Sequence, residues 1–285
     1  MKKILFVLSV VAFYLLIYSC GSEPEAKQTE TKEENNDKEE NNDKEENNEL
    51  ANFEFHMLIA NMPKPLEELS DLNLDHVSFS KELMCPLEAA EKHASAASIA
   101  LNCGLYMADL TYQTVYHKKE DLIAYLTVAH DLAGKCGTEY AFNKVLRSGL
   151  EENINNKDSL QAIIERGYDT MEEYLLKQDR VETATQLLTG GWIETQYLLI
   201  LSLQQMPEPT KHLKYHVFEQ RVHLARLLKL LSEFKDEAGL EAEHDKLVTL
   251  EESFLKIHET EDVSHELLME LANEIEEIRN DIIGM

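Results

Sequence analysis

Apolar residues recur every three or four positions from Asn52 to the end of the chain, and no segment shows the alternating pattern of a β-strand. This pattern predicts one all-α domain over residues 51–285. We expect helices over residues 86–117, 120–133, 181–204, 210–238, 241–258 and 264–283. Their short connections indicate antiparallel neighbours and a multi-helix bundle. A tandem-repeat solenoid is the alternative, but no self-similarity of about 34 residues supports it.

Individual residues predict where these helices begin and end. Pro86 is typical of a helix's first turn, and the long helix that follows is expected to break near residues 95–98 or at Gly104. Gly134 is placed to end the second helix as its C′ residue. Thr210 is placed to cap the helix that follows Pro209.

Two further segments resemble capping boxes, in which a side chain at the start of a helix pairs with one three residues later. They are Asp158–Gln161 and Asp169–Glu172. We expect a helix to follow each of them.

The first residues predict export. Lys2 and Lys3 form a short basic region, and Ile4 to Ile17 is an apolar run of about 14 residues, too short for a comfortable membrane span. The run ends at Ser19-Cys20, which resembles the lipobox of bacterial lipoproteins. The resemblance implies that residues 1–19 are removed and that Cys20 is acylated, with palmitate among its chains. A plain secretory signal or an uncleaved anchor is the alternative.

The remaining cysteines are Cys85, Cys103 and Cys136, and this odd number allows at most one internal disulfide. No two of them are close enough in sequence to form a CxxC motif. We expect Cys103 to be a small buried apolar residue of a helix.

Residues 20–50 predict an acidic, disordered tether behind the lipidated cysteine. Between Gly21 and Glu49 lie twelve acidic and four basic side chains and no aromatic residue, with a six-residue repeat that begins at Lys32. Such a segment repels itself and stays extended. Its acidic start resembles the surface-export signals of Bacteroidota lipoproteins, and a linker without an address function is the alternative.

The net charge of −27 limits the partners of the protein. Nucleic-acid binding depends on basic patches, and anionic lipid surfaces repel an acidic domain. We therefore expect no nucleic-acid partner and a membrane contact only through the N-terminal lipid. The location expected is the cell envelope, at the outer membrane, on its periplasmic face or at the cell surface.

Three segments of the domain are similar to recurring segments of an uncharacterised family of helical lipoproteins from Bacteroidota. They are Ala100–Tyr112, Asn155–Asp158 and Gly190–Glu194, and the similarity covers most of residues 80–230. It implies an all-helical fold and an envelope location, and it implies no activity.

A polar stripe runs along the predicted helix through Gly104, and a second lies near Trp192. We take both as a candidate ligand pocket, formed by Asn102, Tyr106, Asp109, Gln113, Trp192, Glu194 and Tyr197. If the two helices pack together, Asp109 and Glu194 would meet inside the bundle. Paired carboxylates with tyrosines can bind a cation or a small ligand, or serve acid–base chemistry. The alternative is a structural role in which these groups pair inside the core.

A weaker metal candidate is the stripe of His212, His216, Glu219 and His223, which share one helix face. The alternative is a solvated flank of a helix whose apolar residues face the core. No HExxH motif accompanies it, and the chain lacks the glycine-rich motifs that bind phosphate.

The sequence therefore predicts no cofactor and no catalytic residue. The expected function is a non-enzymatic binding or interaction module whose partner is an envelope protein or a small ligand. The alternative is a small-ligand or cation receptor, or an enzyme, that uses the Asp109 and Glu194 pocket.

Overall fold

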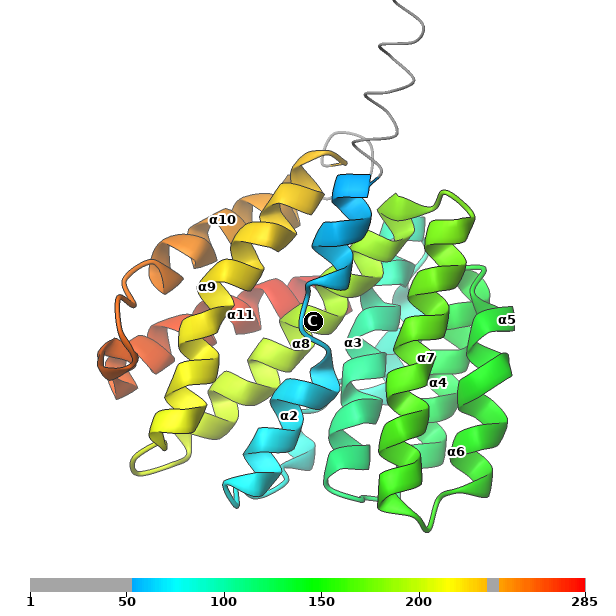
Figure 1. Ribbon diagram of the computed structural model, residues 1–285, viewed down its shortest axis with the longest axis horizontal. Helices are drawn as coiled ribbons and strands as arrows, with labels where there is room; N and C mark the ends of the chain where they lie inside the picture. Colours follow the sequence, from blue (N-terminus) through cyan, green and yellow to red (C-terminus); the bar gives the residue numbers. More distant parts are fainter. Residues whose placement is uncertain (1–52, 235–240, 285) are drawn as a thin grey trace, which may run out of the picture. The chain divides into compact units, whose positions relative to one another are not determined.

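Figure 1 shows a computed structural model of the chain, which describes residues 53–234 and 241–284. No β-strand occurs within these two ranges, and the prediction of an all-α bundle is confirmed. The predicted signal peptide (residues 1–19), the lipidated Cys20 and the predicted tether (residues 20–50) lie outside the described residues.

Residues 53–60 form a first helical segment. The helices that follow it are α2 (Pro65–Leu74), α3 (Ala96–Val115), α4 (Leu122–Lys135), α5 (Glu139–Phe142), α6 (Ser148–Glu152), α7 (Lys157–Lys177), α8 (Val181–Gln204), α9 (Lys211–Ser232), α10 (Glu241–Phe254) and α11 (His265–Ile283). Shorter 3₁₀ turns are Lys81–Leu83, Leu87–Lys92 and Thr260–Asp262, and a π-helical turn, Asn143–Arg147, joins α5 to α6.

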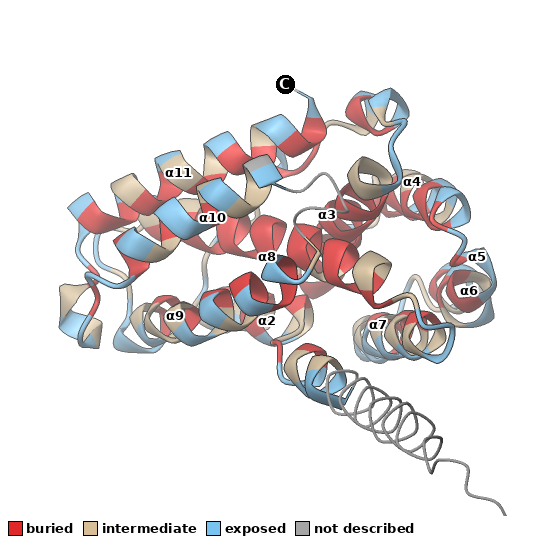
Figure 2. Cartoon of the chain, turned by 90° about the horizontal axis from the view of Figure 1, so that it is seen from above, coloured by how far each residue is buried: buried red, intermediate tan, exposed pale blue. Residues whose placement is uncertain are grey.

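Helices α3 and α8 form the centre of the bundle and are buried on nearly all sides (Figure 2). Their backbones touch where glycines meet. A Cβ on Gly104 would lie 2.0 Å from the carbonyl oxygen of Leu187, and one on Gly190 would lie 1.9 Å from that of Leu101. Any larger side chain would force the two helices apart, so these glycines set the depth of the crossing. Gly104 therefore serves packing and does not break α3, contrary to one of the predicted break points.

The outer helices bury one face and expose the other, as amphipathic helices do (Figure 2). Helices α4 and α7 contact α3, while α9 and α11 contact α8. Helix α10 packs between α9 and α11, and α2 contacts α3, α8 and α9. The predicted core face of α9 is confirmed, since Leu213, Val217, Leu224 and Leu231 are fully buried.

The break predicted near residues 95–98 is found at His93–Ser95, and α3 begins where the Ser95 side chain accepts a hydrogen bond from the backbone N–H of Ser98. Other predicted helix boundaries are wrong for identifiable reasons. Helix α4 runs past Gly134 to Lys135. The left-handed residue that ends it is Gly137, with φ 71°, because the Thr138 N–H pairs with the Ala133 carbonyl in a Schellman closure.

The capping predictions had mixed outcomes. Asn156, not Asp158, caps α7, and Asp169 lies in the interior of that helix, where no boundary occurs. Thr210 caps α9 as predicted, accepting from the N–H of Leu213. Helix α9 ends at Ser232, earlier than expected. Helices α2, α5 and α6 were not predicted.

The three described cysteines, Cys85, Cys103 and Cys136, are buried free thiols. The prediction that Cys103 is a small buried residue is therefore confirmed. No helix within residues 53–234 or 241–284 combines the length and apolar composition needed to cross a membrane.

Candidate functional site

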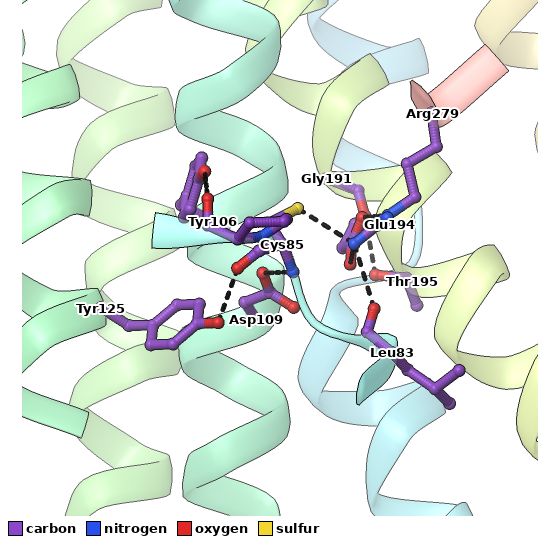
Figure 3. Close-up of polar contacts among 10 residues, drawn as sticks. Leu83, Cys85, Tyr106, Asp109, Tyr125, Gly191, Glu194, Thr195 and Arg279 are labelled. Carbon is purple, nitrogen blue, oxygen red and sulfur yellow. Dashed lines mark hydrogen bonds and ion pairs between the residues drawn. The ribbon is translucent and has the colours of Figure 1, made fainter. Parts of the chain in front are cut away.

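Asp109 on α3 and Glu194 on α8 meet inside the bundle, and neither is exposed to solvent. With Cys85, which lies on the segment between α2 and α3, they form a group whose polar atoms lie within 4.8 Å of one another. Figure 3 shows this group together with Arg279 of α11. We call these four residues the buried charge centre. The predicted meeting of Asp109 and Glu194 thus occurs.

Arg279 supplies the positive charge of this centre and was not predicted. Its Nε lies 2.5 Å from Glu194 Oε2, and its Nη2 lies 3.0 Å from Glu194 Oε1, which makes a bidentate ion pair. Nη2 also contacts the Leu83 carbonyl oxygen at 3.0 Å and the Cys85 Sγ at 3.2 Å (Figure 3). The guanidinium lies over the ring of Tyr197 at 4.1 Å, so this predicted pocket residue packs against Arg279.

Asp109 accepts a hydrogen bond from the backbone N–H of Cys85 at 2.9 Å. Burial, and then the neighbouring charge of Glu194, raises the pKa of the Asp109 carboxyl well above its ordinary value. Its partner is the Cys85 backbone and not the hydroxyl of Tyr106, which donates instead to the Pro86 carbonyl at 2.6 Å. The hydroxyl of Tyr125 donates to the Cys85 carbonyl, also at 2.6 Å (Figure 3).

These contacts hold the segment at residues 83–86 against α3, α8 and α11. Because Arg279 occupies the oxygen atoms of Glu194 and contacts the Cys85 sulfur, it stands where a bound cation would stand. The pocket described below is lined by neither Asp109 nor Glu194. The buried charge centre is therefore arranged to connect helices, with the side chains of Asp109 and Glu194 fully buried.

Two other members of the predicted pocket also lie in the core. The Asn102 amide donates to the carbonyl oxygens of Ser98 and Ile282, at 2.8 and 2.9 Å, and so ties α3 to the end of α11. The Gln113 amide is buried, and neither of its polar atoms has a partner among the described residues.

Trp192, the last predicted member, lies elsewhere, in a pocket of about 190 Å³. We call it the Trp192 pocket. Its walls come from the segment after the first helix and from α2, α7 and α8, and they include Ile59, Met62, Pro63, Lys64, Glu68, Tyr168, Asp169, Glu172, Leu175, Leu187, Leu188, Trp192 and Thr195. The pocket combines an apolar body with a few acidic groups, which is the usual character of a small-molecule site.

Glu68 of α2 is the buried acidic group of this pocket, with 3% of its surface exposed. The amide nitrogens of Gln196 and Gln220 donate to its two carboxylate oxygens, at 2.6 and 2.9 Å. Trp192 Nε1 donates in turn to Gln220 Oε1 at 2.9 Å, which fixes the orientation of that amide. We call these four residues the glutamine network.

Burial raises the pKa of Glu68 from 4.5 to about 7, although the two amide donors act in the opposite direction. The neighbouring charges that act on it, from Glu67 and Glu219, are also negative. The amides of Gln196 and Gln220 hydrogen-bond the Glu68 carboxylate but carry no charge that would neutralise it. Glu68 therefore changes its charge near neutral pH.

The other charged groups of the pocket are largely acidic. Lys64 forms an ion pair with Asp169 of α7. Burial raises the pKa of Glu172, and the charge of Lys64 lowers it. The Tyr168 hydroxyl lies 3.4 Å from Thr111 Oγ1 and so contacts α3.

The predicted histidine stripe divides into two parts. His212 and His216 lie beside Asp71 of α2, close enough for the three side chains to share an ion. Glu219 and His223 lie further along α9, outside that cluster. Together with His216 they line a second hollow that also reaches Glu68.

Glu68, Arg279 and Asp71 were missed by the sequence reasoning. A signal existed for Arg279, which lies among the apolar positions of an amphipathic helix, with Ile275, Ile278 and Ile282 buried beside it. Comparison with protein-family models, with curated proteins and with solved structures finds no match for the chain. The resemblance of residues 80–230 to helical lipoproteins of Bacteroidota stays a prediction.

Proposed function

We propose that this protein is a non-enzymatic binding module of the cell envelope, anchored through lipid on Cys20, and that its ligand is a small organic cation held in the Trp192 pocket. The observation that carries the ligand proposal is a buried carboxylate, Glu68, in the wall of an apolar pocket. The anchor proposal rests on the basic residues, the apolar run and the Ser19-Cys20 boundary at the start of the chain.

The size of the pocket limits the ligand. Its volume of about 190 Å³ is somewhat larger than that of an apolar cavity of about 150 Å³ that accommodates benzene. A ring or a short aliphatic chain with one polar head group therefore fits. Met62, Leu187 and Leu188 supply apolar contacts for such a body.

The charges of the pocket select a cation. Glu68 lacks a counter-charge in the glutamine network, and an ammonium group beside it would supply one. The indole ring of Trp192 adds the attraction of an aromatic face for a cation. The positive charge of Lys64 is already paired with Asp169, so it contributes little attraction for an anionic ligand.

Binding is favoured over catalysis because the pocket gives Glu68 no partner for acid–base chemistry. Each Glu68 oxygen accepts one hydrogen bond and keeps a second lone pair, which an ammonium group can use. The described lining of the pocket contains no histidine, cysteine or serine to act as its partner.

The fluorescence of Trp192 tests the ligand proposal directly, because the chain contains a single tryptophan. Hexylamine should change this fluorescence saturably, while hexanol and hexanoate should bind at least tenfold more weakly. Glu68→Gln should remove the preference for the amine. Glu252→Gln, on the exposed flank of α10, is the matched control.

The pH dependence of binding provides a second measurement. Because the pKa of Glu68 is about 7, the carboxylate is ionised above that pH, and hexylamine should bind more tightly at about pH 8 than at about pH 6. Equal affinity for amine and alcohol in the wild type, or an unchanged preference in Glu68→Gln, would refute the proposal.

The anchor is tested separately. Cells that express the chain and are fed a fatty-acid probe should label the wild type and not Cys20→Ala. Cys85→Ala, in which a buried cysteine is replaced, is the control and should label like the wild type. Labelling of Cys20→Ala at the wild-type level would exclude the lipid anchor.

A further inference from the structure

Two pairs of side chains, each one helical turn apart, face each other across α2 and α9. On α9 the pair is His212 and His216, and on α2 it is Asp71 and the C-cap residue Asp75. Residues four apart lie on the same face of a helix, so each pair presents two ligand atoms in the same direction. This cluster lies outside the lining of the Trp192 pocket.

The distances within the cluster fit a shared metal ion. His216 Nε2 lies 2.6 Å from Asp71 Oδ2, His212 Nε2 lies 3.7 Å from the same oxygen, and the two Nε2 atoms are 3.4 Å apart. Zinc bonds to nitrogen and oxygen of about 2.0–2.1 Å place tetrahedral ligands about 3.3 Å from one another. The Asp71–His216 separation must lengthen and the Asp71–His212 separation must shorten, each by less than 1 Å.

Asp75 provides a second, independent observation. Its Oδ2 lies 3.7 Å from Nδ1 of His212, the ring nitrogen opposite the one that faces Asp71. The Thr210 hydroxyl donates to the same oxygen at 2.6 Å and holds it in place. A carboxylate that hydrogen-bonds the far nitrogen of a histidine is how metal sites fix the tautomer and orientation of that ligand. At 3.7 Å the Asp75 oxygen is just outside hydrogen-bond range of Nδ1, and an approach of less than 1 Å would form this bond.

We propose that Asp71, His212 and His216 bind a zinc ion, with Asp75 as the residue that orients His212. Two imidazoles and one carboxylate are ligands that suit zinc, whereas magnesium and calcium prefer oxygen atoms alone. The side chain of His212 is 54% exposed and those of His216 and Asp71 are 17% and 19% exposed. The fourth position therefore faces solvent, where water completes the coordination.

The test is calorimetric titration of the full chain with zinc chloride, after removal of any histidine tag. Magnesium in excess occupies the weak sites among the 54 acidic side chains of the chain. We expect one tight zinc ion per chain in the wild type. His216→Gln and Asp71→Asn should each weaken binding by more than about 100-fold, since each removes a direct ligand, and Asp75→Asn should weaken it by about 10- to 100-fold.

His223→Gln and Glu219→Gln are the matched controls, because both residues lie on the same helix face and outside the cluster. They should bind zinc as the wild type does. Equal zinc affinity in the wild type and His216→Gln would overturn the proposal, as would a loss of affinity in His223→Gln as large as that in His216→Gln. Circular dichroism of each zinc-free variant verifies that it is folded.

Nitrogen-detected NMR of the histidine side chains makes the test independent of the variants. In the wild type, zinc should shift the Nε2 resonances of His212 and His216, while Nδ1 of His212 keeps its proton for Asp75. Spectra in which zinc leaves both histidines unchanged would exclude the site.

Discussion

Two buried glutamates lie on opposite sides of α8, and the protein accommodates them differently. Glu194 lies on α8 itself and is paired with the guanidinium of Arg279, whereas Glu68 of α2 is held by the uncharged amides of Gln196 and Gln220. Positions 194 and 196 are about 200° apart around the helix. The two centres are therefore neighbours in sequence and are separated by the body of the helix.

The difference shows what a buried carboxylate contributes in each case. With Arg279 in place, the charge of Glu194 is compensated inside the protein, and both of its oxygens accept hydrogen bonds from Arg279 of α11. Arg279 in turn donates to the Leu83 carbonyl, so the ion pair connects α8, α11 and the segment at residues 83–86. Glu68 has hydrogen bonds without a counter-charge, so the cost of its burial persists and raises its pKa to about 7. A compensated carboxylate stabilises the fold, and an uncompensated one beside a pocket leaves a charge for a ligand to neutralise.

The largest effect is expected when the compensation of Glu194 is removed. Arg279→Met leaves Glu194 buried without its counter-charge, and removal of one partner of a buried pair costs about 3–5 kcal/mol. Urea unfolding of the purified protein measures this loss. The double variant Glu194→Gln with Arg279→Met should regain much of it, because no unpaired charge remains. A single variant as stable as the wild type would contradict the assignment of Arg279 as the structural counter-charge.

Glu68→Gln should act in the opposite direction, with a gain in stability that develops as pH rises from about 4.5 to about 7 and is complete above that range. The pKa rises from 4.5 to about 7 on folding, so between these values the unfolded state binds fewer protons and stability falls as pH rises. At about 1.4 kcal/mol per pKa unit, the folded state loses about 3 kcal/mol by neutral pH. The variant should lack this fall.

Unfolding in urea at about pH 5 and about pH 8 measures the slope for wild type and variant. The comparison of slopes is unaffected by any change in hydrogen bonding that the glutamine itself introduces. Gln196 Oε1 has no partner among the described residues, so rotation of that amide can accept from the new side chain. Glu252→Gln should keep the wild-type slope, and a wild-type slope in Glu68→Gln would show that Glu68 is not the titrating group.

The meeting of Asp109 and Glu194 could be predicted from sequence, and the groups that complete each centre could not. Asp109 and Glu194 each lie on a helix that is apolar on almost all sides, and the sequence predicted their meeting on the condition that these two helices pack together. The part that Gly104 and Gly190 play in the crossing was not predicted, because Gly104 was taken as a possible break in its helix. Helical periodicity identifies such a face from one segment alone.

Glu68 and Asp71 were missed because α2 was missed. Its sequence, Pro65–Leu74, is short, begins at one proline two residues after another and has a weak apolar pattern, so local signals did not separate it from a loop. Arg279 is 85 positions from Glu194, and periodicity does not tell which helices pack together. For the same reason the sequence did not predict that Asp71 lies beside His212 and His216. It grouped these histidines with His223 because periodicity relates only residues of the same helix.

The smallest change in stability is expected for substitution of Asp109. Two substitutions at this position distinguish a hydrogen-bonding role of the side chain from a role that depends on its negative charge. Burial and the neighbouring Glu194 raise the pKa of Asp109 well above its usual range, so folding favours the neutral form of this carboxyl. Asparagine has the same size, is neutral at every pH and keeps an oxygen for the Cys85 N–H. Asp109→Asn should therefore change stability by less than about 1 kcal/mol.

Asp109→Ala should cost more, about 1–3 kcal/mol, because it leaves the buried N–H of Cys85 without an acceptor and opens a space between α3 and α8. Thermal and urea unfolding of both variants at neutral pH measures the difference. If Asp109 were ionised in the folded state and paired with Arg279, Asp109→Asn would lose most of what Asp109→Ala loses. Equal destabilisation by the two substitutions would thus contradict a neutral Asp109, and it would place two charges, not one, opposite the single guanidinium of the buried charge centre.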